Sequence, residues 1–254
     1  MKLVLTLLFI ILFISNSYSF SLSPYSVLIQ AEKNETAYSE VTLTNDNNFS
    51  YQVKSYPMDM DIDNNSKKIY KLPDKANKSF ASNIRVFPEE FILKPYESKT
   101  VKIFVEKNPD LKGGNKAMVY FEAIPIDNEK NKKVDKILVA MRLGVLVLHE
   151  VKNTIVRASR IKNFYVEQKE NEIIFYLKIE NTGNSYIEPT TFVSIFKDNN
   201  FFIGNLEFNK SIVFAGKEKT LNTKLNYKLD KGKYYAIVTY QYDKDKNNKY
   251  SKKF

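Results

Sequence analysis

Few residues of this chain have the types and spacing that catalysis requires. A nucleophilic triad needs a base beside its nucleophile, but the chain has one histidine, His149, and no cysteine. His149-Glu150 begins like a zinc-protease helix, yet no second histidine follows, so no metal-binding pair forms. The seven glycines are scattered and make no phosphate-binding loop. The sequence therefore predicts a protein that is not an enzyme and holds no cofactor or metal.

One acidic run deserves a comparison with a calcium loop. Asp59, Asp61 and Asp63 stand at alternate positions, as at the start of such a loop. The sixth position would then be Asn64 instead of glycine, and the twelfth Tyr70 instead of glutamate. A solvated acidic loop is the better interpretation of this segment.

The elements that would have to position any site are strands. Short β-branched and aromatic runs alternate with Asn, Asp, Gly and Lys turns at a spacing of about 8–12 residues, which is typical of β-sandwiches. A chain of 254 residues suits two domains. We predict an all-β protein with two tandem immunoglobulin-like β-sandwich domains after a cleaved signal peptide. The boundaries are 1–19 for the signal peptide, 20–150 for the N-terminal domain and 151–254 for the C-terminal domain.

The pattern also places individual strands. In the first domain it predicts strands at 26–31, 37–44, 49–56, 84–87, 100–105, 117–126 and 134–149. The stretch 59–82 is expected to be loop, with room for one short strand. In the second domain it predicts strands at 154–156, 163–167, 172–180, 191–196, 202–206, 220–227 and 233–242. The strand at 233–242 is expected to be the final strand of the chain. Gly183 is expected to supply a positive φ in the turn after 172–180.

The start of the chain predicts export. Lys2 precedes an apolar run at 3–14, and Ser17-Tyr18-Ser19 supplies small residues, so cleavage is expected before Phe20. The run is shorter than the ~20 residues of a membrane-spanning helix, so no stable membrane insertion is expected. The periplasm is the expected location, with secretion or the cell surface as the alternative.

Charge and cysteine content limit the partners and the source of stability. Without cysteine, stability must come from apolar burial, which 43% hydrophobic residues can supply. The formal net charge is +10, but the lysines are scattered through turns and read mainly as solvated loop charge. Nucleic acid is not an expected partner of an exported protein.

The most unusual segment is the apolar run at 136–148. Both of its strand faces are apolar for most of its length, although a strand with one wet face should alternate. Its second face must therefore be covered. Packing against the second domain or a long loop is one explanation, and a client protein that binds by strand addition is the other.

Several landmarks together resemble the N-terminal domain of the periplasmic chaperones of the chaperone–usher pathway, which assemble pili and fimbriae. Their order and spacing carry the resemblance over about 130 residues. They are Ser21-Leu22-Ser23-Pro24, Val41-Thr42-Leu43-Thr44-Asn45, Arg85-Val86-Phe87-Pro88, Phe91-Ile92-Leu93-Lys94-Pro95, Thr100-Val101-Lys102-Ile103, Val119-Tyr120-Phe121 with Ile124-Pro125, and the apolar run at 137–148.

The resemblance implies donor-strand complementation, in which the chaperone lends apolar residues of an edge strand to a subunit that lacks a strand. Two alternating sets could be lent, and the uninterrupted one is favoured as the client-binding set: Ile137, Val139, Met141, Leu143 and Val145. The other set is Leu138, Ala140, Leu146 and Leu148, interrupted by Arg142 and Gly144. The implied partners are pilin-like or other secreted Ig-like subunits, with an outer-membrane usher as a further candidate.

The chain departs from the family in its basic residues. The family anchors the client's C-terminal carboxylate with two basic residues in the inter-domain cleft, but 25–31 contains no Lys or Arg. Arg142, Lys152 and Arg157 are candidate cleft residues that match no family position. Two functions thus remain open: a divergent assembly chaperone, or a secreted or surface Ig-like module for adhesion or cell-wall binding.

Overall fold

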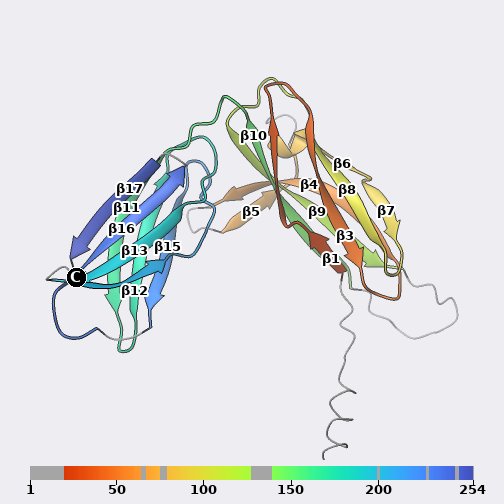
Figure 1. Cartoon of the computed structure of the whole chain (residues 1–254). Coiled ribbons are helices and arrows are strands. Elements are labelled where there is room, and N and C mark those ends of the chain that lie inside the picture. Colours follow the sequence, from red (N-terminus) through yellow and green to blue (C-terminus); the bar gives the residue numbers. More distant parts are fainter. Residues whose placement is uncertain are drawn as a thin grey trace, which may run out of the picture.

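The computed structural model describes residues 20–63, 67–74, 79–126, 139–198, 201–226, 229–243 and 246–253. Within these ranges the regular elements are β-strands and one 3-10 helix, η1 (Phe80–Asn83). The strands build two immunoglobulin-like sandwiches (Figure 1). The predicted all-β class with tandem sandwiches is confirmed, whereas the expected signal peptide lies outside the described residues.

The first sandwich contains β1 (Phe20–Ser23), β2 (Ser26–Ala31), β3 (Ala37–Asn45), β4 (Tyr51–Ile62), β5 (Lys68–Lys71), β6 (Ile84–Phe87), β7 (Glu90–Leu93), β8 (Ser98–Val105), β9 (Gly114–Pro125) and β10 (Met141–Val151). One sheet has the order β1-β3-β8-β6. The other has the order β2-β10-β9-β4-β5, with β7 also beside β4. The chain therefore changes sheets between β1 and β2.

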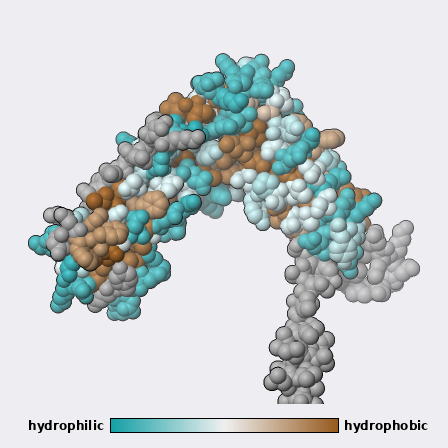
Figure 2. All heavy atoms as spheres, viewed as in Figure 1, coloured by the Kyte–Doolittle hydropathy of each residue, from teal (hydrophilic) through white to brown (hydrophobic). Residues whose placement is uncertain are grey.

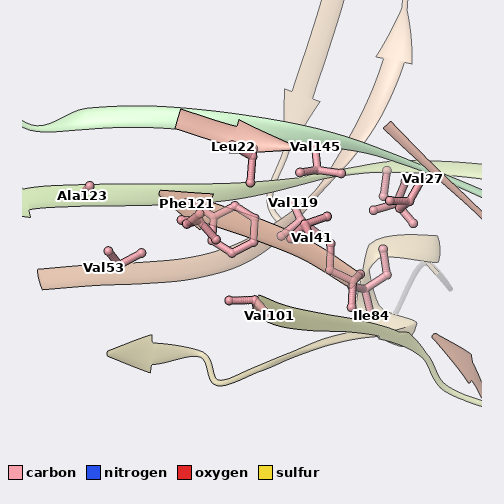
Figure 3. Close-up of a cluster of buried hydrophobic side chains, with 14 of the residues drawn as sticks. Leu22, Val27, Val41, Val53, Ile84, Val101, Val119, Phe121, Ala123 and Val145 are labelled. Carbon is pink, nitrogen blue, oxygen red and sulfur yellow. The ribbon is translucent and has the colours of Figure 1, made fainter. Parts of the chain in front are cut away.

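The core of this sandwich forms because alternate residues of both sheets point inward. Figure 3 shows Leu22, Val41 and Val101 from one sheet facing Val119 and Val145 from the other. Each such side chain contributes roughly 1.5–3 kcal/mol when fully buried. The cysteine-free chain relies on this burial for its stability.

The second sandwich contains β11 (Ser159–Gln168), β12 (Ile173–Asn181), β13 (Thr190–Lys197), β14 (Phe202–Glu207), β15 (Glu218–Leu225), β16 (Tyr234–Asp243) and β17 (Lys246–Lys253). One sheet has the order β11-β12-β15 and the other β14-β13-β16-β17. They enclose a separate core that includes Phe164, Phe175 and Leu177. The strands up to β10 and those from β11 form separate sheets. The predicted boundary at 150/151 lies between these two groups of strands and stays a prediction.

Three predicted elements were wrong. Strand β4 continues to Ile62, into the segment expected to be loop, because it pairs with both β5 and β9. Residues 154–156 form no strand, since Asn184 satisfies their backbone instead: its side chain accepts from Val156 N and donates to Thr154 O. Strand β17 follows the strand expected to be the last and pairs with β16.

The expected role of Gly183 is also corrected. Gly113 and Gly216 are the glycines with positive φ among the described residues, at 62° and 69°. Gly183 is needed for a close approach, because an added Cβ would lie 2.2 Å from the carbonyl oxygen of Val156. Glycine is therefore needed at this position because there is no room for a side chain, and not because of its backbone conformation.

Both sandwiches use a buried asparagine at the end of a core strand. Asn45 ends β3, and its side-chain amide donates to Phe49 O and Lys94 O, each over 2.8 Å. Asn181 ends β12, and its amide donates to Ser185 O at 2.7 Å and to Val213 O at 2.8 Å. Each is 0% exposed. These amides satisfy backbone carbonyls that would otherwise be buried without a partner.

Candidate functional site

Strand β10 is paired along its whole length on one side and only along its second half on the other. Residues 141–150 pair antiparallel with β9. On the opposite edge, β2 runs parallel to β10 and begins to pair at Leu146. Strand β1 pairs with β3 in the other sheet, so it does not reach this edge. Among the described strands none pairs with the outer edge of residues 141–145, which we call the open edge.

The backbone direction at the open edge follows from one hydrogen bond. Leu146 N donates to Tyr25 O over 2.9 Å, so the Leu146 N–H points away from β9. Backbone groups two residues apart on a strand point the same way. Arg142 and Gly144 therefore direct their N–H and C=O groups to the open edge, where another strand could pair with them.

The inner face of β10 carries described members of the favoured client-binding set. Met141 and Leu143 are half-buried and pack against the edge of the first core. Val145 is 0% exposed within that core. Val139, which precedes the strand, is 65% exposed. Ile137 lies outside the described residues. Exposure on this face therefore falls from Val139 through Met141 and Leu143 to Val145, whose side chain is part of the core.

The outer face of the same stretch is covered by a tyrosine cluster of the first domain. An added Cβ on Gly144 would lie 2.7 Å from Met118 Cε and 3.0 Å from Tyr120 Cε1. The Arg142 guanidinium lies 4.8 Å from the Tyr120 ring centroid, and its Nη1 donates to Tyr56 Oη over 3.3 Å. Burial, together with a hydrogen bond with Tyr70, raises the pKa of Tyr120 to about 12.

The second half of the outer face meets the second domain. Leu148 is buried in a cluster with Met60, Met118 and Phe214, and Leu146 packs against that cluster. Phe214 belongs to the second domain. The alternative that the second domain covers this strand therefore holds for Leu146 and Leu148, whose apolar character has an inter-domain cause.

A buried polar network fixes the junction between the domains. The Glu150 carboxylate is 1% exposed as a residue and accepts hydrogen bonds from Arg157 Nη2 at 2.5 Å and Ser185 Oγ at 2.7 Å. Gln30 Nε2 donates to its other oxygen over 3.1 Å. Because a buried carboxylate is costly unless it is paired and hydrogen-bonded, these partners hold the three segments together.

The predicted basic residues do not come together. Arg142 lies on the tyrosine cluster, and Arg157 is paired with Glu150. Lys152 lies 3.4 Å from Glu32 on the surface. The structure does not gather these three into one anion site, because each is engaged by a different neighbour.

Two other lysines face the inter-domain region and were missed. Lys116 Nζ lies 5.1 Å from the Phe214 ring centroid, and burial lowers its pKa. Lys217 Nζ lies 3.1 Å from Asp61 Oδ1 and donates to Ile62 O. A pocket of about 270 Å³ beside them is lined by residues of both domains, among them Met60, Leu146 and Lys217. The alternation of Lys116 with Met118 and Tyr120 on one strand face was the available signal.

His149 is buried and packs against other side chains of the first domain. It is 2% exposed, its ring stacks on Phe80 at 5.5 Å between centroids, and Nδ1 lies 3.4 Å from Asn115 Nδ2. Burial lowers the pKa of His149 to about 4. The neutral imidazole therefore acts here as a core group at the end of the first domain.

The acidic run is engaged in structural contacts. Asp59 Oδ1 accepts from Ala81 N at the start of η1 over 3.0 Å, and Asp61 pairs with Lys217. Within the described ranges, no cluster of three or more His, Cys, Asp or Glu side chains could hold a metal ion. The same ranges contain no helix long and apolar enough to cross a membrane.

Comparison with known proteins gives a fold. No protein-family model matches the chain, and no curated protein matches it in sequence. The crystal structure of the class 5 fimbriae chaperone CfaA is similar at a TM-score of 0.54 and 17% identity, covering 92% of this chain and 99% of that one. A chain of a chaperone–tip adhesin complex of CFA/I fimbriae biogenesis matches at 0.50 and 16%, covering 92% and 98%. The chain has the two-domain fold of fimbrial chaperones, which confirms the resemblance at the level of fold.

Proposed function

We propose that this protein is a non-enzymatic assembly chaperone that binds pilin-like or other Ig-like subunits by strand addition at the open edge of β10. The single observation that supports this most is the register of β2, which leaves residues 141–145 with no described strand on one side. A subunit that lacks one strand would gain the backbone partners and apolar side chains that it is missing. The expected location is the periplasm, after removal of residues 1–19.

The backbone supplies affinity in this proposal. Arg142 and Gly144 turn two N–H and two C=O groups to the open edge, in line with Leu146, which uses the same direction to bond Tyr25. A client strand would continue the ladder on the other side of Leu146, where the pairing of β2 with β10 begins. Such main-chain bonds are largely independent of the client's sequence, which suits a chaperone with several clients.

The side chains supply specificity. Val139 is exposed, and Met141 and Leu143 close the first core from one side only, because no described strand flanks them beyond β10. A client strand added at the open edge would place its own inward residues beside these two. The two cores would then share Met141 and Leu143, and burial of this apolar area would stabilise the complex by roughly 25 cal/mol per Å² before association costs.

Co-purification from the envelope of the native host tests the proposal. The wild type should carry a small Ig-like subunit, identified by mass spectrometry, and Val139→Asp with Met141→Asp should lose it, since carboxylates in an apolar interface are costly. Phe87→Asp with Ile92→Asp is the control, because both residues are exposed apolar residues of the same domain away from β10, at 69% and 56%.

Met141 is half-buried, so the double variant must be checked for folding by circular dichroism. If the double variant is not folded, Val139→Asp alone replaces it in the test. Val139 is 65% exposed, so its replacement leaves the core intact. A wild type that purifies alone, or a folded variant that keeps the subunit, would reject the proposal. The first outcome would favour the surface-module alternative.

A further inference from the structure

An exposed aromatic group lies at the end of the second domain that is remote from β10. Phe201 and Phe202 are 63% and 54% exposed. Phe202 packs edge-on against Phe196 at 5.4 Å, and Phe196 stacks on Tyr235 at 5.3 Å with an interplanar angle of 11°. We call these four residues the aromatic tip. Two neighbouring exposed phenylalanines that adjoin half-buried rings form an apolar patch, a feature that marks interaction sites when it is large enough.

Backbone bonds hold the tip in place. Lys197 N donates to Phe201 O over 2.8 Å, and Asp198 N donates to Lys233 O over 3.0 Å. Thus the end of β13, the start of β14 and the start of β16 meet at one place. An added Cβ on Gly232 would lie 3.4 Å from Lys197 Cε, so this lysine runs along the same loop. The aromatic rings and the lysines around them are therefore presented together by the sheet.

Three lysines lie close in sequence to the rings. Lys197, Lys231 and Lys233 lie in the segments that meet at the tip, and none of them forms an ion pair within the described part of the chain. Asp198 and Asp230 belong to the same end, so these three lysines and two aspartates together carry a net charge of +1. Figure 2 shows brown, hydrophobic atoms gathered at the end of the second domain where Figure 1 marks the C-terminus.

We propose that the aromatic tip docks the protein on an anionic membrane surface. Exposed rings near the strand ends and lysines in the adjoining segments match the two layers of a bilayer interface, apolar acyl chains below and anionic headgroups at the surface. Aromatic rings favour that interface. Charge complementarity selects a lipid surface with anionic headgroups over a neutral one.

This site is independent of the proposed chaperone function. The tip belongs to β13, β14 and β16 of the second sandwich, whereas the open edge belongs to β10 of the first, on the far side of the inter-domain junction (Figure 1). A client at the open edge would leave the tip free. The protein could therefore hold a subunit while it is bound at a membrane surface.

Co-sedimentation of the full chain with phosphatidylcholine vesicles, with and without phosphatidylglycerol, tests the inference. The wild type should sediment with the anionic vesicles only. Phe201→Ser with Phe202→Ser should lower the partition coefficient by about tenfold or more. Phe87→Ser is the control and should bind like the wild type, because it is 69% exposed but lies in the first domain.

A second set of variants tests the contribution of charge to vesicle binding. Lys197→Gln, Lys231→Gln and Lys233→Gln should weaken binding by about fivefold for each lysine. Lys94→Gln, Lys107→Gln and Lys112→Gln change the net charge equally in the first domain and should weaken it much less. Absence of vesicle binding by the wild type, equal binding to neutral vesicles, or equal loss in both lysine sets would overturn the inference, even if client capture at β10 succeeds.

Discussion

The backbone N–H of Leu146 donates a hydrogen bond to the carbonyl oxygen of Tyr25 over 2.9 Å. This bond is where the first strand, after changing sheets, reaches β10. Before it, the edge of β10 has no described partner, and after it the edge is closed by β2. The same bond therefore defines both the length of the open edge and the direction of the groups that it offers.

Replacement of Gly114 by alanine should destabilise the contact between the domains. A Cβ on Gly114 would lie 2.3 Å from Ser185 Oγ and 2.7 Å from Ser185 Cα, so one domain must shift. We expect the free energy of unfolding in urea to fall by about 1–3 kcal/mol. Gly204→Ala is the matched control, because its Cβ would meet nothing within 4 Å and should change stability by no more than about 0.5 kcal/mol. Equal effects would show that Gly114 is not a contact point.

Removal of the Arg157 guanidinium should lower the free energy of unfolding, because it leaves the buried Glu150 carboxylate without a countercharge. Arg157→Met leaves Glu150, which is almost fully buried, with Ser185 and Gln30 but no countercharge. We expect a loss of about 3 kcal/mol at neutral pH. Arg160→Met breaks an exposed pair with Glu180 and should cost less than about 1 kcal/mol. If chemical denaturation gives similar values for the two variants, the junction does not depend on this pair.

Protonation of His149 should weaken the fold in acid. Its folded pKa of about 4 lies below the ordinary histidine value of about 6.5, because burial disfavours the charged ring. The unfolded state then takes up the proton first, so the contribution to stability is complete above pH 6.5 and declines as the pH falls toward 4. We expect on the order of 2 kcal/mol from this group.

His149→Gln is the comparison for that titration. Its stability, measured in urea at several pH values, should fall less than that of the wild type between pH 6.5 and 4. Other groups titrate equally in both proteins, so the difference between the two curves isolates His149. Parallel curves would contradict the buried neutral imidazole.

The sequence was sufficient for the class of fold and most strands, because two-residue alternation reports which side of a strand is buried. Strand 26–31 and strand 84–87 were predicted with the bounds that the structure has. Strand β17 was missed because lysine and asparagine dominate 246–253, and pairing with β16 rather than residue preference makes it a strand. The buried roles of Asn45 and Asn181 were not predicted, because they depend on carbonyls far along the chain.

Less of the candidate site than of the fold could be predicted from the sequence. Alternation identified two faces of the apolar run but could not say which face was core, because that depends on the register of β2 and on the second domain. Val145 is therefore core, and Leu148 meets Phe214 across the junction. Lys116 and Lys217 come from distant segments, and only the folded chain places them at the same inter-domain region.

The most direct test compares Arg142→Pro with Arg142→Ala in capture of an Ig-like subunit. Both variants lose the contacts of the guanidinium with Tyr56 and Tyr120. Only proline also removes the N–H that points to the open edge, while the bonds to β9 are made by other residues and remain. The account predicts that both variants fold, that the alanine variant keeps the subunit and that the proline variant loses it. A folded proline variant that binds as well as the alanine variant would contradict pairing at this edge.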